Sequence, residues 1–363
     1  MCIRDSRNGS SGVPNFSSTF STDKEPSKTP YPLPAILPRQ NLLSMPTISV
    51  IVPVYNSAET LAESLESVLA QKGADFEIIA VNDGSTDNSL ELLRKKFGHD
   101  SRVKIISQAN GGPSAARMSG VGASESEWLY FHDSDDIMLP GALAGMLAVA
   151  KADTDIDMVE PEFTVRYTDG METSSRPAHP TTSGVGQLGA ILSDRGHWTL
   201  SVLLRRNLVK DMTYTSEGML LGEDAIWKTQ ILLAARKVAS YPHPAFVYTQ
   251  RVPSTVSETP DDRKFQSYLN HIRLIAKYIT ASPYADALAE PMAFYHKVTT
   301  FQRLEWRRAE GLAEALLHIR EDTKRFPRLA HSLNRHQRKI LRYFTFGRLI
   351  GNALLSRWLN RHR

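Results

Sequence analysis

The sequence contains a single cysteine, Cys2, among its 363 residues. An intrachain disulfide is therefore excluded, and so is a metal site built from several thiolates. Because disulfide-free chains are typical of reducing compartments, we expect a cytoplasmic location. The chain also lacks any uncharged apolar run near the roughly 20 residues that a membrane-spanning helix needs.

A strong excess of charge of either sign is also missing. The chain carries 43 Lys and Arg against 39 Asp and Glu, a formal net charge of +4. This balance does not favour nucleic acid as a partner. The length allows one large domain with an appendage, or two domains.

Residues 1–45 are rich in Ser, Thr and Pro and show no apolar periodicity. A segment of this composition cannot bury enough apolar surface to fold by itself, so we predict a disordered leader. Ordered structure is expected to begin within TISVIVPVYN, residues 47–56.

From this point short apolar runs alternate with helical patterns. The runs cover 48–52, 76–83, 103–108 and 127–133, and the first three are rich in β-branched residues. Strand–helix units of this length predict right-handed crossovers and a parallel sheet with helices on its faces, an α/β fold.

The segment after the first run predicts a helix with one apolar face. That face comprises Leu61, Leu65, Val68 and Leu69. Asn56 is expected to cap the helix, with Glu59 three residues later completing a capping box.

Polar side chains follow each predicted strand. They are Tyr55 and Asn56, Asn82 and Asp83, Asn110, and Asp133 to Asp136. Ligands of parallel sheets bind beyond the carboxyl ends of the strands. We therefore expect these four loops to converge on one ligand-binding rim.

The pattern loosens after residue 150. Strand material with a turn is expected at 156–170, and a loop leading into a helix at 218–235. Residues 256–363 read as a helical C-terminal region, and its segment 325–363 contains basic residues but no Asp or Glu. The small net charge therefore conceals a basic tail.

The carboxylates of Asp133, Asp135 and Asp136 follow the fourth strand closely. Like charges repel unless a cation is present, and Mg²⁺ or Mn²⁺ is the oxygen-seeking ion that suits them. The alternative is a solvated turn, since Asp is a common turn former before a proline such as Pro140.

Three further side chains suit a nucleotide ligand. Asp83 can accept hydrogen bonds from a base edge, Tyr55 can stack on a flat ring, and Arg117 can approach a diphosphate. The alternatives are a turn acid for Asp83, a core tyrosine for Tyr55 and a surface salt bridge for Arg117.

Glu223 and Asp224 open the helix predicted near residue 223. Acids are favoured at a helix N-terminus by the helix dipole without any catalytic role. A general base also needs an ionised carboxylate near neutral pH, which such a position provides.

Taken together, five motifs over residues 46–255 resemble the family 2 glycosyltransferases of the GT-A fold. They are ISVIVPVYN, VNDGSTDNS, NGGPSAARMSG, DSDDIMLP and GEDAIW. The resemblance implies a catalytic domain with a nucleotide-binding half at 46–150 and an acceptor half at 151–255. YTQRVPSTVS, residues 248–257, resembles the Tyr–Arg–Ser stretch that closes this domain.

The resemblance also implies roles for single residues. Those expected to bind the nucleotide-sugar donor are Pro53, Val54, Tyr55, Asn56, Asp83, Arg117, Asp133 and Ser134. Asp133 and Asp135 match the D-x-D motif, with Asp135 as the direct ligand of Mn²⁺ or Mg²⁺. Asp224 matches the catalytic base, and the acceptor side comprises Glu223, Trp198 and Trp227.

Two positions depart from the family pattern. His132 stands where an aliphatic residue is usual, and we interpret it as a packed histidine rather than a ligand. Leu204 precedes Arg205 where relatives often have tyrosine, so the acceptor side is less constrained by the resemblance.

The implied activity is an inverting, metal-dependent transfer of a sugar, UDP-linked in most of the family, to a glycan or lipid-linked glycan during cell-surface polysaccharide synthesis. The alternative is a catalytically silent donor-binding or scaffold protein of the same fold. A nucleotidyltransferase is disfavoured, because PVYNSAET stands where its Gly-rich basic loop is expected.

The basic segment 325–363 mixes its charges with Phe344, Phe346, Leu349, Ile350 and Trp358. It is expected to lie on an anionic membrane surface, which suits a lipid-linked acceptor and a peripheral position on the cytoplasmic face. The alternative is a helical segment that packs against the protein or in an oligomer.

Overall fold

The structure is a computed structural model and describes residues 45–174, 180–209, 212, 222–250, 262–302 and 311–343. The predicted leader lies outside these residues except for Met45, and so does the boundary predicted at 255. The division into domains therefore stays a prediction.

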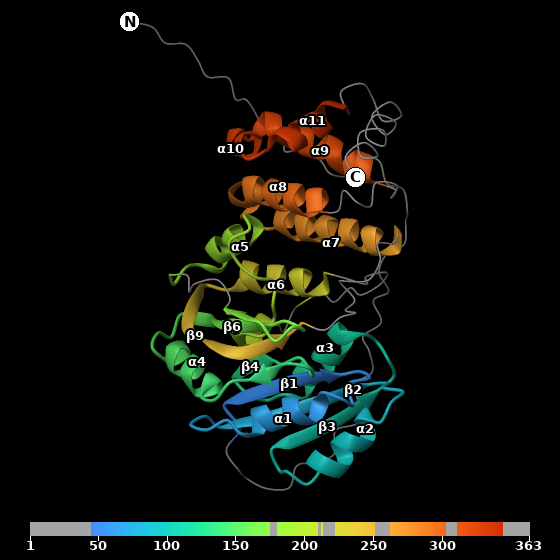
Figure 1. The fold of residues 1–363 in the computed structure, drawn as a ribbon. Coiled ribbons are helices and arrows are strands. Elements are labelled where there is room, and N and C mark those ends of the chain that lie inside the picture. Colours follow the sequence, from blue (N-terminus) through green and yellow to red (C-terminus); the bar gives the residue numbers. More distant parts are fainter. Residues whose placement is uncertain are drawn as a thin grey trace, which may run out of the picture. The chain divides into compact units, whose positions relative to one another are not determined.

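The four predicted strands form one side of the sheet (Figure 1). They are β1 (Ile48–Val54), β2 (Phe76–Asp83), β3 (Val103–Gln108) and β4 (Trp128–Phe131). Their order is β3-β2-β1-β4, and all three pairings are parallel. The predicted parallel α/β arrangement is confirmed here.

The other side of the sheet is mixed. After β4 it continues in the order β8-β6-β9-β5, and β7 pairs with β6. The bounds are β5 (Ile137–Met138), β6 (Ile156–Arg166), β7 (Glu172–Ser174), β8 (Leu203–Arg205) and β9 (Lys237–Thr249). The pairing of β6 with β9 is long and parallel, whereas β5, β7 and β8 add short antiparallel pairings. The strand and turn predicted at 156–170 are present as β6 and the turn before β7.

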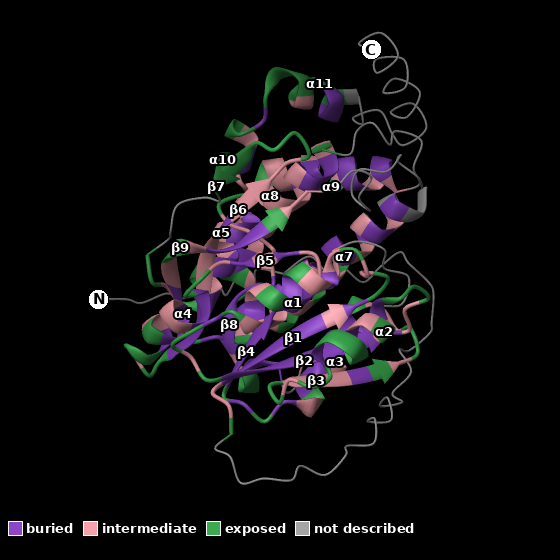
Figure 2. Ribbon diagram, turned by 60° about the horizontal axis from the view of Figure 1, so that its bottom comes forward, coloured by how far each residue is buried: buried purple, intermediate pink, exposed green. Residues whose placement is uncertain are grey.

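Helices cover both faces of the sheet (Figure 2). They are α1 (Leu61–Leu69), α2 (Ser89–Leu92) with the π-helical turn η1 (Leu93–Phe97), α3 (Pro113–Ala123), α4 (Ala142–Lys151), α5 (Gly184–Leu192), the 3₁₀ turn η2 (Arg206–Leu208) and α6 (Glu223–Ala234). Successive residues of β1 point to opposite faces, so Val50 and Val52 join the core under α1 and α4. Ile51 joins the other core, under α3, α5 and α6.

The apolar face predicted for α1 is confirmed, since Leu61, Leu65 and Val68 are fully buried. The predicted capping box is wrong, because α1 begins at Leu61 and no side chain bonds to its first turn. Asn56 instead has a positive φ of 49° and accepts a 2.8 Å hydrogen bond from the amide of Thr86. The side-chain oxygen of Asn56 thus connects the loop after β1 to the loop after β2. A contact between such remote residues cannot be predicted from a local sequence pattern.

The helical C-terminal region is confirmed in its described residues. It comprises α7 (Asp262–Ala281), α8 (Ala285–Gln302), α9 (Leu312–Arg325), α10 (Pro327–His331) and α11 (Arg335–Tyr343). Helix α7 packs on α6 and α8 packs on α5. Ile275, Ile279 and Leu288 belong to the same apolar core as α3 and α6, so these helices share a core with the sheet.

Helices α9 and α11 form a smaller apolar cluster together with Leu269 of α7. Ile340 and Leu341 of α11 are buried in this cluster. The packed-helix alternative is therefore correct for α11, while residues 344–363 lie outside the described part of the chain. None of the helices that the structure describes has an apolar stretch long enough for a membrane crossing.

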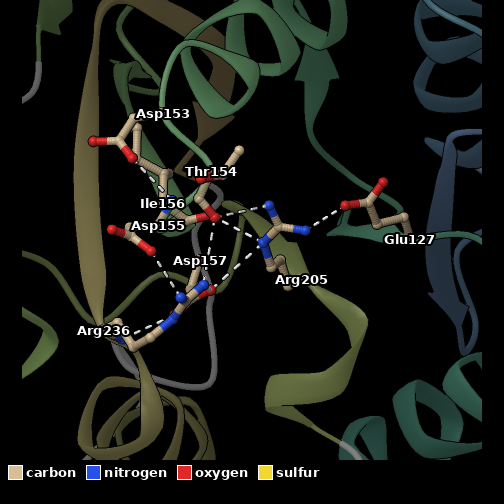
Figure 3. Close-up of polar contacts among 8 residues, drawn as sticks. All are labelled: Glu127, Asp153, Thr154, Asp155, Ile156, Asp157, Arg205 and Arg236. Atoms are coloured by element: carbon tan, nitrogen blue, oxygen red, sulfur yellow. Dashed lines mark hydrogen bonds and ion pairs between the residues drawn. The ribbon is translucent and has the colours of Figure 1, made fainter.

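A cluster of charged residues joins the strands at the amino ends of β4, β6 and β9 (Figure 3). Asp157 is 3% exposed and accepts hydrogen bonds from the main-chain N and the guanidinium of Arg236, at 2.8–3.0 Å. Arg205 lies over the ring of Trp128 and donates to Glu127 and to the carbonyl of Ile156. Because β4 and β6 run in the same direction, this cluster lies at the edge opposite the predicted rim, and Arg205 has a structural role.

Candidate active site

The loops that follow β1, β2 and β4 meet at one rim, as predicted. The main-chain N of Asn56 donates to Ser85 Oγ at 3.1 Å. Ser134 bonds Ser57 at 2.8 Å between hydroxyl groups, and its carbonyl accepts from Thr60 Oγ1 at 2.8 Å. Several hydrogen bonds thus hold these loops together before any ligand binds.

The fourth loop reaches the rim by a close approach of two backbones. Gly84 has a φ of +69°, and a Cβ at this position would lie 2.7 Å from the main-chain N of Asn110. Only glycine allows both this conformation and this approach. The loop that contains Asn110 is thereby held beside the end of β2.

The residues predicted to bind the donor base differ in exposure. The ring of Tyr55 is 50% exposed, so the core-tyrosine alternative is wrong and the ring is accessible for stacking. Val54 is fully buried, so only its main chain can face a ligand. Pro53 lies between these extremes.

Asp83 is 2% exposed and is already engaged. Its Oδ1 accepts from Gln108 Nε2 at 2.7 Å and from the main-chain N of Gly111 at 2.9 Å, while Oδ2 accepts from Gly112 at 2.8 Å. The carboxylate thus shapes the Gly-Gly loop before α3. Its acceptor lone pairs exceed these three bonds, so it can still receive a further donor.

Arg117 is the central cation of the rim. It lies on α3 and is 4% exposed, so the surface salt bridge considered for it is wrong. Its Nη1 donates to Asp224 at 2.9 Å, and its Nη2 donates to Asp133 at 3.1 Å. One guanidinium therefore joins the predicted base to the predicted D-x-D motif.

The burial of Arg117 follows from how closely α3 packs on β1. Gly120, one turn further along α3, would place a Cβ only 2.4 Å from Ile51 Cγ2. The absence of a side chain at Gly120 therefore lets the helix approach the sheet. Residues three apart share one helix face, so Arg117 is brought down onto the strand ends.

Asp224 lies on the first turn of α6, with 38% of its side chain exposed. Burial raises the pKa of its carboxyl to about 6, and the charge of Arg117 opposes this rise. Asp133 and Glu223 add to it through their negative charges. Since a pKa of about 6 is below neutral pH, most of the Asp224 carboxyl groups are ionised there and can accept a proton.

Helix α6 is also anchored by the residues after Asp224. Lys228 is 2% exposed, pairs with Glu160 of β6 at 2.6 Å and donates to the carbonyl of Thr199 at 3.0 Å. Trp227 is 3% exposed and donates from Nε1 to Ser114 Oγ at 3.1 Å. Its predicted place on the acceptor side is corrected, because its ring is packed in the core between α6 and α3.

The loop after β4 that contains Asp133, Asp135 and Asp136, called the acidic loop below, concentrates negative charge around the ring of Tyr248. Burial raises the pKa of Tyr248, and so do the negative charges of Asp135, Asp136 and Asp133. Asp133 has 43% of its side chain exposed, whereas Asp136 is 2% exposed and its main-chain N donates to the Asp133 carbonyl within the turn. Asp136 thus matches the turn acid of the alternative interpretation.

The described residues contain no group of three or more His, Cys, Asp or Glu side chains that would hold a metal by themselves. Asp133 and Asp135 offer two partly exposed carboxylates on one loop. Such a pair fits Mg²⁺ or Mn²⁺ when phosphate oxygens and water complete the coordination. The residues present are therefore compatible with a metal that binds together with a diphosphate.

His132 is confirmed as a packed histidine. It is fully buried, and its Nε2 is 3.1 Å from Ser64 Oγ of α1. Burial lowers its pKa to about 4 despite the nearby charge of Asp133. The imidazole is therefore neutral at pH 7 and joins the acidic loop to α1.

Three supporting interactions were not found from the sequence. Gln108 holds Asp83, the Lys228–Glu160 pair holds α6, and Tyr248 lies beside the acidic loop. The stretch that contains Tyr248 was recognised, but not the effect of the acids on its pKa. The other two depend on partners remote in sequence and left no local signal.

The acceptor side has two remaining predicted members. Glu223 precedes Asp224 at the start of α6 and is partly exposed. Trp198 is also partly exposed, and its ring packs edge to face with Tyr295 of α8, 5.2 Å between centroids. Glu223 lies on α6 itself. Trp198 is held near α6, because it precedes Thr199, whose carbonyl accepts a hydrogen bond from Lys228 of α6.

Comparisons with known proteins agree with this geometry. Residues 49–205 match the model of glycosyl transferase family 2. The chain is 26% identical to the uncharacterized glycosyltransferase YibD of Escherichia coli over 262 residues, 69% of this chain and 76% of YibD. It is 36% identical to chondroitin synthase of Pasteurella multocida over 118 residues, 32% of this chain but only 12% of that protein.

A solved structure of S. aureus TarS in complex with UDP-GlcNAc superposes with a TM-score of 0.66 at 20% identity. The alignment covers 87% of this chain and 92% of the TarS chain. It shows a common fold, a GT-A-type sheet flanked by helices and followed by C-terminal helices. With its motif residues gathered at the rim of that sheet, the part of the chain at residues 49–205 matches a family 2 glycosyltransferase domain.

Proposed function

We propose that the chain transfers a sugar, with inversion, from a UDP-linked donor to a hydroxyl group of a glycan or lipid-linked glycan in cell-surface polysaccharide synthesis. The observation that carries this proposal is the bridge from Arg117 to Asp224 and Asp133 at the carboxyl ends of the strands. One guanidinium thus contacts both the proposed base and a residue at the proposed diphosphate end of the donor site.

The donor side is supported by groups suited to a nucleotide. The exposed ring of Tyr55 suits stacking on a base, and the main chain at Pro53 and Val54 lies beside it. Asn56, Asp83, Asp133 and Ser134 supply polar atoms for the base, ribose and diphosphate. The similar fold of TarS was solved with UDP-GlcNAc, which agrees with a UDP-linked donor.

Asp135 and Asp133 would hold Mn²⁺ or Mg²⁺ at the acidic loop. When bound, such an ion acts as a Lewis acid that stabilises the negative charge of a departing diphosphate. Arg117 supports the same end of the site, since it fixes one oxygen of Asp133.

In the proposed reaction, Asp224 accepts the proton of the acceptor hydroxyl while that oxygen attacks the anomeric carbon. The bond from this carbon to the diphosphate oxygen breaks, and the nucleoside diphosphate leaves with the electron pair. Arg117 keeps Asp224 oriented and ionised, and Glu223 and Trp198 border the acceptor.

The silent-binder alternative remains a candidate for the same fold. It is disfavoured because all of the acids expected in the reaction are present and Asp224 is oriented by an ion pair. Release of free UDP from UDP-GlcNAc and related UDP-sugars, scored with glycan acceptors present, separates the two, because a silent protein binds donor without releasing UDP.

We also propose that the chain associates peripherally with an anionic membrane on its cytoplasmic face. From residue 325 onward the chain contains no acidic residue. The last residue of α9 and the helices α10 and α11 present exposed basic side chains, which include Arg325, Arg328, Arg335, Arg338, Lys339 and Arg342. Because the apolar side chains of α11 are packed inward, the association would be electrostatic.

Asp224→Asn should strongly lower the rate of transfer while leaving donor binding intact. Loss of a general base lowers the rate by about 10²- to 10⁴-fold. In the unmodified chain, kcat/KM should rise with pH through about 6, because the carboxyl must lose its proton to act. Normal transfer by Asp224→Asn would refute the assignment, and Asp155→Asn, an exposed acid at the opposite edge, is the matched control.

Arg117→Met should lower the transfer rate and move the acid limb of the pH profile above about 6, because the charge that lowers the pKa of Asp224 is lost. We expect a loss of about 2 kcal/mol in unfolding free energy, below the 3–5 kcal/mol of fully buried pairs, since both carboxylates can hydrate. Arg117→Lys should restore part of the rate.

The control for Arg117→Met is Arg102→Met, which removes an exposed ion pair with Asp100. Denaturant unfolding should show a change below about 0.5 kcal/mol for this control. An unshifted pH profile in Arg117→Met would contradict the proposed effect on Asp224.

Asp135→Asn should weaken the effect of Mn²⁺ on donor binding. Calorimetry of UDP binding with and without Mn²⁺ measures this effect independently of activity. Asp136→Asn should keep the Mn²⁺ effect and instead lower stability, because Asp136 is buried in the turn. Equal Mn²⁺ dependence in Asp135→Asn and the unmodified chain would count against a metal at this residue.

Replacing Arg335, Arg338 and Lys339 by Glu should reduce co-sedimentation with vesicles of anionic phospholipid. Each basic side chain near the surface contributes about 1 kcal/mol, so the three together contribute about 3 kcal/mol. Truncation after residue 325 is a poorer test, since it removes Ile340 and Leu341 from their cluster.

The matched control for this charge reversal is the same change at Arg94, Lys95 and Lys96 of η1, which are also exposed and basic. Equal loss of binding in both triple variants would refute a specific surface at α11.

A further inference from the structure

One residue of the C-terminal helices, His271 of α7, lies beside the turn that begins α6. Gly222 precedes Glu223 and Asp224 and has a φ of +92°. A Cβ at Gly222 would lie 2.7 Å from Nδ1 and 2.8 Å from Cγ of His271, which belongs to α7. The imidazole therefore packs directly on the backbone of the residue before the first turn of α6.

His271 is in turn held by α8. It is 2% exposed, and its Nε2 is 2.9 Å from the hydroxyl of Tyr295. The ring of Tyr295 meets the ring of Trp198 edge to face, 5.2 Å between centroids. A continuous set of contacts thus runs from the Gly222 turn through His271 and Tyr295 to Trp198.

The first turn of α6 needs external support. Its N-cap, Gly222, has no side chain to accept from the free amides of that turn. Arg117, Trp227 and Lys228 anchor the helix towards α3, the acidic loop and β6. The imidazole of His271 restrains the helix at the residue before that turn.

We propose that His271 and Tyr295 are positioning residues for sugar transfer, which hold the Asp224 turn and Trp198 in their relative places at the acceptor side. The inference rests on the proposed role of Asp224. It extends the functional unit beyond residues 49–205, which match the family, to α7 and α8. A small displacement of a catalytic group is sufficient to lower a rate strongly, so a remote brace of this kind affects the reaction.

The first test is Tyr295→Phe, which removes the hydroxyl but keeps the ring against Trp198. A neutral hydrogen bond contributes about 1 kcal/mol, so kcat should fall by about 5-fold while the Kd for UDP stays the same. Hydrogen exchange of the amides at 222–228 should become faster by a similar factor, with no change in β1 and β2. Tyr284→Phe, at an exposed tyrosine just before α8, is the matched control.

A second test uses the contact between Gly222 and His271. Gly222→Ala and His271→Ala should each lower kcat and speed exchange in the first turn of α6. The double variant should be no worse than Gly222→Ala alone, because the clash with the ring is removed. Additive effects of the two substitutions would overturn the proposed contact.

Unchanged kcat in Tyr295→Phe and His271→Ala would overturn the positioning role, even with faster local exchange. Faster exchange spread equally over β1 and β2 would also overturn it, since that pattern indicates general destabilisation. Absence of sugar transfer by the unmodified chain would instead refute the proposed function. In that case the exchange data alone would still decide whether the pair braces the turn.

Discussion

A buried guanidinium is the feature on which the rest of this site depends. Removing a cation from water costs several kcal/mol, and the cost is offset only when its donors meet well-placed acceptors. Arg117 meets two carboxylates, Asp224 of α6 and Asp133 of the acidic loop. Helix α3, helix α6 and the loop after β4 are therefore fixed relative to one another by one side chain.

Helix α6 lies beside this cation and contacts both the sheet region and the C-terminal helix α7. The pairs Trp227–Ser114 and Lys228–Glu160 hold it to α3 and β6, and α7 packs along it. The acid proposed as base is consequently placed by contacts from both halves of the chain. Helices α7 and α8 contribute to the same core as the sheet, although the family match ends before them.

The two ends of the strands have different roles. The amino ends of β4, β6 and β9 are joined by the Asp157 cluster, in which a buried carboxylate is bonded by Arg236 and lies near Arg205. The carboxyl end of β4 is followed by the partly exposed Asp133, and that of β1 by the accessible ring of Tyr55. Charged groups thus stabilise the fold at one edge and remain available to ligands at the other.

The sequence by itself determined the four parallel strands, the apolar face of α1 and the rim where the loops meet. These features depend on local periodicity and on the rule that carboxyl ends of parallel strands share one edge. The same local reasoning placed Asp224 at a helix start. His132 was interpreted as packed from the family pattern, in which an aliphatic residue is usual at this position.

Only the tertiary structure decided which partners the polar side chains have. Arg117 and Asp224 are separated by 107 positions, and Asn56 and Thr86 by 30. A helix cap was predicted for Asn56 and an acceptor contact for Trp227, because sequence reasoning saw only nearby backbone and family analogy. Hydrogen bonds between remote segments depend on how α3 and α6 pack on the sheet, and no local pattern encodes that approach.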